Sequence, residues 1–252
     1  MFNLQHILYL VISFVLTAGL LVVFELKVKN QEQKNSILIF SAVITVIIHY
    51  SNIWVEYFAT KGQNTVESNH ILPVYPCNVV MWMLLACALI KDKKSVIFRL
   101  LSDFCFYGGI VCGVVGLVFN ANFDANPTLL NYNVLKGMLS HSTMLFGCLY
   151  LMVGGYIKIG VFNSLSVTFG LGTFVVCGLT VNKLFEAFGM TPIDGMFLLN
   201  NPYFPVSPMI LGVGAIILMF IILVLFEQRL PKEERWYTKL KNQFKKETKE
   251  KV

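Results

Sequence analysis

Charged residues are scarce in this chain of 252 residues, because only 13% are Asp, Glu, Lys or Arg while 56% are hydrophobic. A soluble domain carries about 25% charged residues. The mean hydropathy of +0.67 agrees with this shortage, since so few polar groups cannot cover a globular surface. The composition therefore excludes a soluble domain and predicts an integral membrane protein.

Motifs for metal, redox and nucleotide chemistry are also missing. The sequence has no Cys-x-x-Cys pair, no glycine-rich phosphate or dinucleotide motif, and no His-Glu-x-x-His motif. We therefore expect neither a cofactor nor a metal. Six cysteines are present, all in long apolar segments and none in a loop, which argues against a disulfide framework. They are Cys77, Cys87, Cys105, Cys112, Cys148 and Cys177.

Apolar runs near the roughly 20 residues that cross a membrane as a helix are abundant. The seven runs lie near 8–26, 37–58, 72–90, 97–119, 135–157, 161–182 and 208–227. The first run has no basic region before it and no small-residue cleavage site soon after it, so we expect it to span the membrane and not to be a signal peptide. The predicted fold is all-α, with a seven-helix transmembrane domain over residues 1–229.

Basic residues fall in alternate connections between these runs. They are Lys27, Lys29 and Lys34 after the first run, Lys91, Lys93, Lys94 and Arg99 after the third, Lys158 after the fifth, and many in the tail. Lys61, Lys136 and Lys183 are the exceptions. Because Lys and Arg are retained on the cytoplasmic side, we expect a multi-pass cell-membrane protein with its N-terminus outside and its C-terminus in the cytoplasm.

The tail, residues 230–252, is basic but also carries aromatic and apolar residues at helical spacing. They are Trp236, Tyr237, Leu240 and Phe244. One interpretation is an amphipathic helix on the anionic lipid of the inner leaflet. The other is a solvated positive anchor, and neither interpretation calls for nucleic acid.

Cys77 is the most informative residue, because two prolines precede it in Leu72-Pro73-Val74-Tyr75-Pro76-Cys77-Asn78. Proline fits the first turn of a helix but not its interior, so the third helix should begin at Pro76. Residues 72–75 would then enter the membrane without helical structure. A thiol in the first turn of a helix is in a position that favours a thiolate. The alternative is an inert, buried cysteine.

Other polar residues share the outer half of the predicted bundle. His49, Asn52 and Glu56 follow one another at roughly helical spacing, and His141 lies six residues into the fifth run. Cys77 and His141 should each lie roughly 8–9 Å below the outer boundary. Polar groups at membrane depth usually face a cavity, so the sequence predicts a polar pocket that opens outward. A histidine hydrogen-bonded between helices is the alternative for His141, and His6 is expected to be an interfacial anchor.

Three motifs occur in order along the chain: Leu72-Pro73-x-x-x-Cys77, Lys136-Gly137-Met138-Leu139-Ser140-His141-Ser142, and a loop from Gly195-Met196-Phe197-Leu198 to Pro202. On these motifs most of the chain resembles the YwaF-like family of bacterial multispanning membrane proteins. That family is similar to eukaryotic membrane cysteine acyltransferases that act on phospholipids. A histidine usually lies two residues before the family's cysteine, where this chain has Tyr75.

The resemblance implies that Cys77 is the nucleophile, that His141 is the base, and that Asn182 belongs to a polar pocket. We expect substrate contacts from a wider set of polar residues, namely Asn78, His49, Asn52, Glu56, Asn182 and Ser142. The expected substrate is a membrane phospholipid, and the reaction is acyl transfer or acyl hydrolysis. The alternatives are a non-enzymatic protein that binds or transports a lipid or solute, and an assembly partner docked through the basic tail. The absence of an internal repeat argues against transport.

Overall fold

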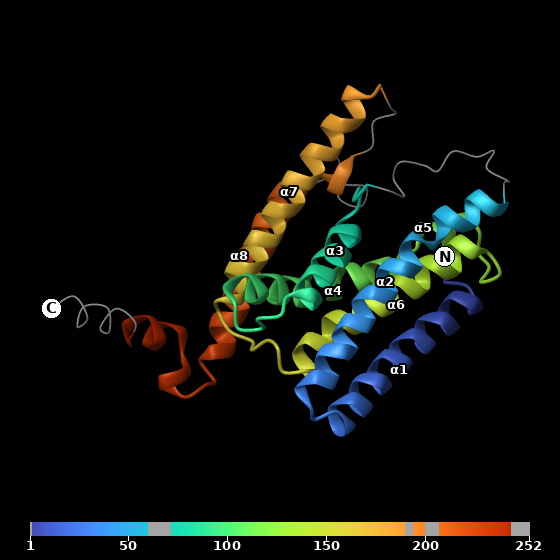
Figure 1. The fold of residues 1–252 in the computed structure, drawn as a ribbon. Coiled ribbons are helices and arrows are strands. Elements are labelled where there is room, and N and C mark those ends of the chain that lie inside the picture. Colours follow the sequence, from blue (N-terminus) through green and yellow to red (C-terminus); the bar gives the residue numbers. More distant parts are fainter. Residues whose placement is uncertain (1, 60–71, 190–193, 200–206, 243–252) are drawn as a thin grey trace.

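The computed structural model describes residues 2–59, 72–189, 194–199 and 207–242, and these residues form helices without any strand. Eight α-helices follow one another along the chain (Figure 1). They are α1 (Leu4–Lys27), α2 (Gln31–Ala59), α3 (Pro76–Leu89), α4 (Val96–Val118), α5 (Ala121–Ala125), α6 (Tyr132–Val153), α7 (Asn163–Ala187) and α8 (Pro208–Glu227). Two 3₁₀ turns, η2 (Gly195–Phe197) and η3 (Lys232–Glu234), complete the described chain. The predicted all-α fold is confirmed.

Five helical segments are long and apolar enough to cross a membrane. They are α1, α2, α7, the stretch 96–125 that contains α4, and residues 210–227 of α8. Helix α3 is also apolar but has only 14 residues, which corresponds to about 21 Å. Five of the seven predicted apolar runs overlap these five segments, and the runs near 72–90 and 135–157 overlap α3 and α6, which are not among them. The chain is therefore a helical protein with several segments suited to a bilayer.

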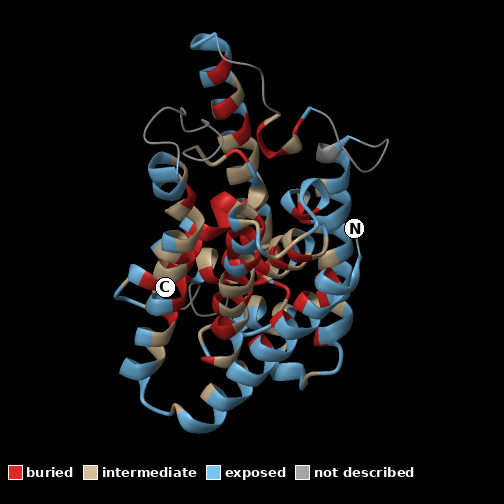
Figure 2. Ribbon diagram, turned by 90° about the vertical axis from the view of Figure 1, so that its right-hand side faces the viewer, coloured by how far each residue is buried: buried red, intermediate tan, exposed pale blue. Residues whose placement is uncertain are grey.

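The helices divide into an inner group and an outer group. In the most apolar stretch of α1, 17% of the residues are buried inside the protein, and in that of α8 only 11% are buried. The corresponding share is 41% for the segment that contains α4. Figure 2 shows the buried residues gathered in the middle of the molecule and exposed residues along its periphery. In a bilayer the exposed apolar faces of α1 and α8 would contact lipid, while α2, α3, α4 and α6 hold the core.

Helices α4 and α6 pack closely because three glycines of α4 face side chains of α6. A methyl group at Gly109 would overlap Cys148, one at Gly113 would come within 2.9 Å of Leu145 Cβ, and one at Gly116 would overlap His141. Residue numbers rise along α4 as they fall along α6, so the two helices are antiparallel. Small residues that bring helix backbones together are typical of membrane helix pairs.

Helix α2 is antiparallel to α6 on another side. Gly147 of α6 faces Ser41, and Thr45 Oγ1 donates a hydrogen bond of 3.0 Å to Thr143 Oγ1. Further along the pair, Ser51 of α2 is hydrogen-bonded to Tyr132 of α6. The first two facing pairs have the same register, and the third is shifted by five residues, so the number of an α2 residue gives its level along α6 to within about one turn.

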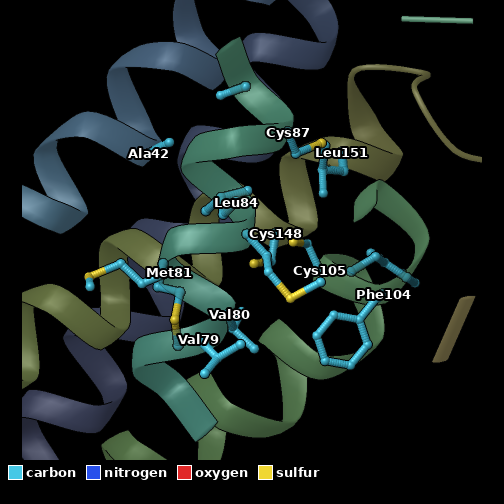
Figure 3. Packing of buried hydrophobic residues seen from close by; sticks show 14 of the residues in the cluster. Ala42, Val79, Val80, Met81, Leu84, Cys87, Phe104, Cys105, Cys148 and Leu151 are labelled. Carbon is cyan, nitrogen blue, oxygen red and sulfur yellow. The ribbon is translucent and has the colours of Figure 1, made fainter. Parts of the chain in front are cut away.

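The main hydrophobic core lies where α2, α3, α4 and α6 meet, and Figure 3 shows part of it. Three of its members, Cys87, Cys105 and Cys148, are fully buried free thiols that pack with Val80, Leu84 and other apolar side chains. These cysteines occupy positions that small apolar residues would fill equally well.

His6 is not the interfacial anchor that the sequence suggested. Helix α1 begins at Leu4, which places His6 in its first turn, where the side chain is fully buried. Its ring stacks on Phe123 with 4.7 Å between centroids, and Nε2 lies 3.1 Å from the carbonyl oxygen of Leu117. His6 therefore joins the start of α1 to the end of α4.

The start of the tail is held against the bundle by one carboxylate. Glu227, which is only 3% exposed, accepts hydrogen bonds of 2.7 Å from the backbone N–H groups of Val161 and Trp236. Residues 236–242 are helical, and this stretch includes three residues of the predicted amphipathic face. The fourth, Phe244, lies outside the described residues.

Candidate functional site

The start of α3 has the structure that its prolines predict. Pro76 occupies the first turn of the helix, and residues 72–75 before it are not helical. The backbone N–H of Met196 in η2 donates a hydrogen bond of 2.7 Å to the carbonyl oxygen of Val74, which ties this entry segment to the loop after α7. Cys77 therefore lies in the first turn of α3, as expected.

Cys77 and His141 line the same small pocket. Its other lining residues are Thr45, His49, Met81, Ser140 and Met144, from α2, α3 and α6. The pocket has about 190 Å³ of empty space, with only about 10 Å³ open to the centre of a water molecule, close to the minimum that one water needs. A thiol, two imidazoles and two hydroxyl groups thus converge on one small space.

A chain of hydrogen bonds runs from Cys77 to His49 through a buried amide. The Cys77 thiol donates to Asn78 Oδ1 at 3.3 Å, and Asn78 Nδ2 lies 3.3 Å from His49 Nε2. Asn78 is only 1% exposed, so both ends of its amide are used inside the protein. Because the donated bond stabilises the protonated thiol, it opposes the tendency of a helix start to favour a thiolate.

The tautomer of His141 is set by its own helix. Nδ1 lies 2.7 Å from the carbonyl oxygen of Gly137, one turn earlier in α6. A carbonyl oxygen only accepts, so Nδ1 carries the proton and Nε2 has the free lone pair of a neutral imidazole. The ring packs on Gly116 of α4. His141 is therefore held with its proton on Nδ1 and with the ring edge that carries Nε2 against Gly116.

Lys136 entered the sequence analysis as an exception to the charge pattern and as the first residue of the second motif, without a role in the site, yet it is 9% exposed within α6. Its ammonium interacts electrostatically with Cys77, His141 and Glu56. A buried lysine is rare, and neither its position in the sequence nor its neighbours there show that it points into the protein.

Two of the predicted substrate-binding residues, Asn52 and Glu56, continue the pocket-facing side of α2 beyond His49. Asn52 is 1% exposed, and its Nδ2 has no hydrogen-bond partner among the described residues. Glu56 follows one turn later, with partial exposure. These two residues lie next to the pocket but do not line it.

Asn182 and Ser142 lie away from the pocket. Asn182 Oδ1 accepts a hydrogen bond of 2.7 Å from the N–H of Gly195, next to the Met196 that binds Val74. Asn182 therefore supports the loop that holds the entry to α3. Ser142 Oγ lies 3.3 Å from the hydroxyl of Tyr9, so it faces α1.

The pocket also contains residues that sequence reasoning missed. Thr45, Met81, Ser140 and Met144 line the pocket but were not singled out as site residues. Thr45 precedes His49 by one turn, which is the one sequence signal that pointed to it.

Within the described residues, no group of three or more His, Cys, Asp or Glu side chains could hold a metal ion.

Comparison with known protein families matches residues 1–227 to the model of the TMEM164 family. The match therefore covers all eight α-helices and ends where the tail begins. No curated protein and no solved structure matches the chain.

Proposed function

This chain belongs to the TMEM164 family of membrane proteins, and we propose that it is a phospholipid acyltransferase or acyl hydrolase with Cys77 as its nucleophile. In this proposal all seven long apolar segments cross the membrane, with the N-terminus outside and the C-terminus in the cytoplasm. The alternating basic connections and the alternating helix directions support that arrangement.

The observation that carries the proposal is the convergence of Cys77 and His141 on one pocket from two different helices. A thiol becomes an effective nucleophile when an oriented base removes its proton. His141 meets this need, because its Nδ1–H is held by Gly137 and its Nε2 is free. The resemblance to cysteine acyltransferases assigns the same roles to the same two residues.

The proposed reaction has two steps. His141 Nε2 takes the proton of the Cys77 thiol as sulfur attacks the carbonyl carbon of a phospholipid ester, and the proton then passes to the departing glycerol oxygen. A thioester on Cys77 and a lysolipid result. In the second step His141 deprotonates the hydroxyl of a lysolipid acceptor, or water, which attacks the thioester, and the proton returns to sulfur.

Substrate entry requires the pocket to widen. The space at Cys77 accommodates about one water molecule, which is too little for an ester with its acyl chain. Two of the lining residues, Met81 and Met144, have unbranched, flexible side chains that adapt readily to a bound group. Movement of these side chains would open the pocket without a change in helix packing.

The test is acyl exchange between labelled phospholipid and unlabelled lysophospholipid, with the purified protein in lipid nanodiscs. Cys77→Ala should abolish exchange and remove an acyl adduct seen in the intact mass of the wild type. Cys177→Ala, which changes a half-buried thiol of α7 outside the pocket, should leave both unchanged. Undiminished exchange in Cys77→Ala would refute the nucleophile assignment. Lipid binding without exchange or adduct in the wild type would favour the alternative, a non-enzymatic lipid-binding or transport protein.

A further inference from the structure

Two buried polar side chains lie at a similar level just beyond the pocket, toward the end of the bundle where α3 begins. Asn52 lies about one turn beyond the pocket residue His49 on α2, and Lys136 lies one turn beyond the pocket residue Ser140 on α6. The contacts of Ser41 with Gly147 and of Thr45 with Thr143 give the spacing of the α2–α6 pair. That spacing places Asn52 level with Lys136, although the hydrogen bond between Ser51 and Tyr132 has a register shifted by five residues toward the start of α6.

Neither side chain has a hydrogen-bond acceptor among the described residues. Lys136 is 9% exposed and forms no hydrogen bond or ion pair with the described residues, although it interacts electrostatically with Cys77. The amide nitrogen of Asn52 is buried without a partner in the part of the chain that the structure describes. Buried donors without partners are costly, so an ammonium and an amide at one level indicate a place for an anion.

A third contribution comes from the start of α3. Its N-cap residue, Tyr75, makes no side-chain hydrogen bond to the first turn. Tyr75 therefore does not cap the partial positive charge of this helix start, and helix starts favour anions. Because Cys77 belongs to this turn and interacts with Lys136, the helix start and the ammonium act on the same region.

Glu56 limits the charge that this region can accept. It lies one turn beyond Asn52 on α2 and interacts electrostatically with Lys136. Its carboxylate offsets part of the positive charge and repels an anion with two negative charges more strongly than an anion with one. A singly charged oxyanion suits the set of groups better than a phosphomonoester.

We propose that Lys136, Asn52 and the start of α3 form a subsite for the singly charged phosphodiester of a phospholipid headgroup. This inference rests on the proposed function, since it assumes that a phospholipid presents its ester to Cys77. One helical turn is about 5.4 Å, which is comparable to the few bonds between the phosphate of a glycerophospholipid and its acyl ester. The subsite would hold the phosphate while the ester reaches the thiol.

The test measures lipid binding in Cys77→Ala protein, so that no turnover interferes. The full chain in detergent is titrated with dioctanoylphosphatidylcholine, dioctanoylglycerol, dioctanoylphosphatidic acid and inorganic phosphate, and the bound species are counted by native mass spectrometry. Adding Lys136→Gln should weaken phosphatidylcholine binding about tenfold, the usual effect of losing a hydrogen bond to a charged group. Binding of dioctanoylglycerol, which lacks the phosphate, should not change.

Matched variants separate recognition from folding. Lys136→Arg keeps the charge and should bind phosphatidylcholine within about threefold of the parent, while Asn52→Leu should weaken it several-fold. Lys158→Gln removes an exposed lysine from the connection between α6 and α7 and should have no effect. Phosphatidic acid should bind more weakly than phosphatidylcholine, and Glu56→Gln should remove that preference.

Three results would overturn the subsite. The first is unchanged phosphatidylcholine binding in Lys136→Gln. The second is an equal loss of dioctanoylglycerol binding, which would make Lys136 a structural residue. The third is Lys136-dependent binding of inorganic phosphate without Lys136-dependent binding of the lipid, which would indicate a free-phosphate site. Every binding measurement uses protein without Cys77, so its result does not depend on whether Cys77 is the nucleophile. The acyl-exchange test likewise does not depend on the subsite, so the two proposals can fail separately.

Discussion

The imidazole of His141 packs directly on Gly116 of α4, at a point where any side chain would overlap ring atoms Cδ2 and Nε2. Gly116 thereby makes room for the base at the edge of the Cys77 pocket. With Nδ1 held by the carbonyl of Gly137 on the other side of the ring, the imidazole has one orientation. The position of the proposed base is thus set by two glycines from two helices.

Gly116→Ala should displace the His141 ring. We expect acyl exchange to fall about 100-fold, the effect of moving a catalytic group by about 1 Å, and the free energy of unfolding to fall by about 1–3 kcal/mol from overpacking. Gly172→Ala is the matched control, because a methyl group there meets nothing within 4 Å. Exchange rates and thermal unfolding of the two variants are compared, and equal behaviour would contradict the role of Gly116.

Asn78 should couple Cys77 to His49. Asn78→Leu preserves the approximate volume but removes both hydrogen bonds, and leaving His49 Nε2 without a donor should cost about 1–3 kcal/mol of stability. A double-mutant cycle of Asn78→Leu with His49→Phe measures this directly by chemical unfolding. We expect a coupling free energy of about 0.5–3 kcal/mol between the two sites. Additive effects would show that the amide and the imidazole act independently.

Glu227 should hold the start of the tail. Glu227→Ala removes the acceptor of the Val161 and Trp236 N–H groups, at about 1.5–3 kcal/mol for each hydrogen bond to the carboxylate. The expected result is faster cleavage by trypsin after Arg235 and Lys239. Glu234→Ala, which changes an exposed carboxylate in η3, should leave the cleavage rate unchanged. Equal cleavage of both variants would mean that the tail is held by other contacts.

Lys93 should give the stability of the protein a measurable alkaline pH dependence. Lys93 lies between α3 and α4, where its ammonium donates to the carbonyl oxygens of Cys87 and Ala88 at 3.1 and 2.9 Å and lies 4.8 Å from the Phe98 ring. Partial burial lowers the pKa of Lys93 below its ordinary value of 10.5. The folded protein therefore releases this proton at a lower pH than the unfolded chain does.

Between the lowered pKa and 10.5, the unfolded chain binds more protons at Lys93, so the free energy of unfolding should rise with pH in that interval. The measurement is the difference between the pH–stability curves of the wild type and Lys93→Gln from about pH 8 upward. The wild type should gain stability relative to the variant as pH rises. Parallel curves, or a relative loss, would contradict the prediction.

The membrane character of the chain and the extent of its helices followed from the sequence, since both depend on composition and on local constraints. Pro76 shows this most clearly, because proline cannot lie inside a helix without losing a hydrogen bond. The start of α3 was therefore predicted to the residue. The presence of Cys77 and His141 in one pocket was also expected, from their equal depth along two helices of the same direction.

The rotation of each helix and the partners of each polar side chain were decided only by tertiary packing. Ser142 is adjacent to His141, yet it faces Tyr9 of α1, because successive residues of a helix point in directions about 100° apart. From the sequence, Lys136 was assigned to a connection between two apolar runs, whereas in the structure it is buried within α6. A membrane helix is apolar on most sides, so its sequence carries little information on which side faces the protein, and the contacts of Gly116, Asn78 and Lys136 became visible only in the packed bundle.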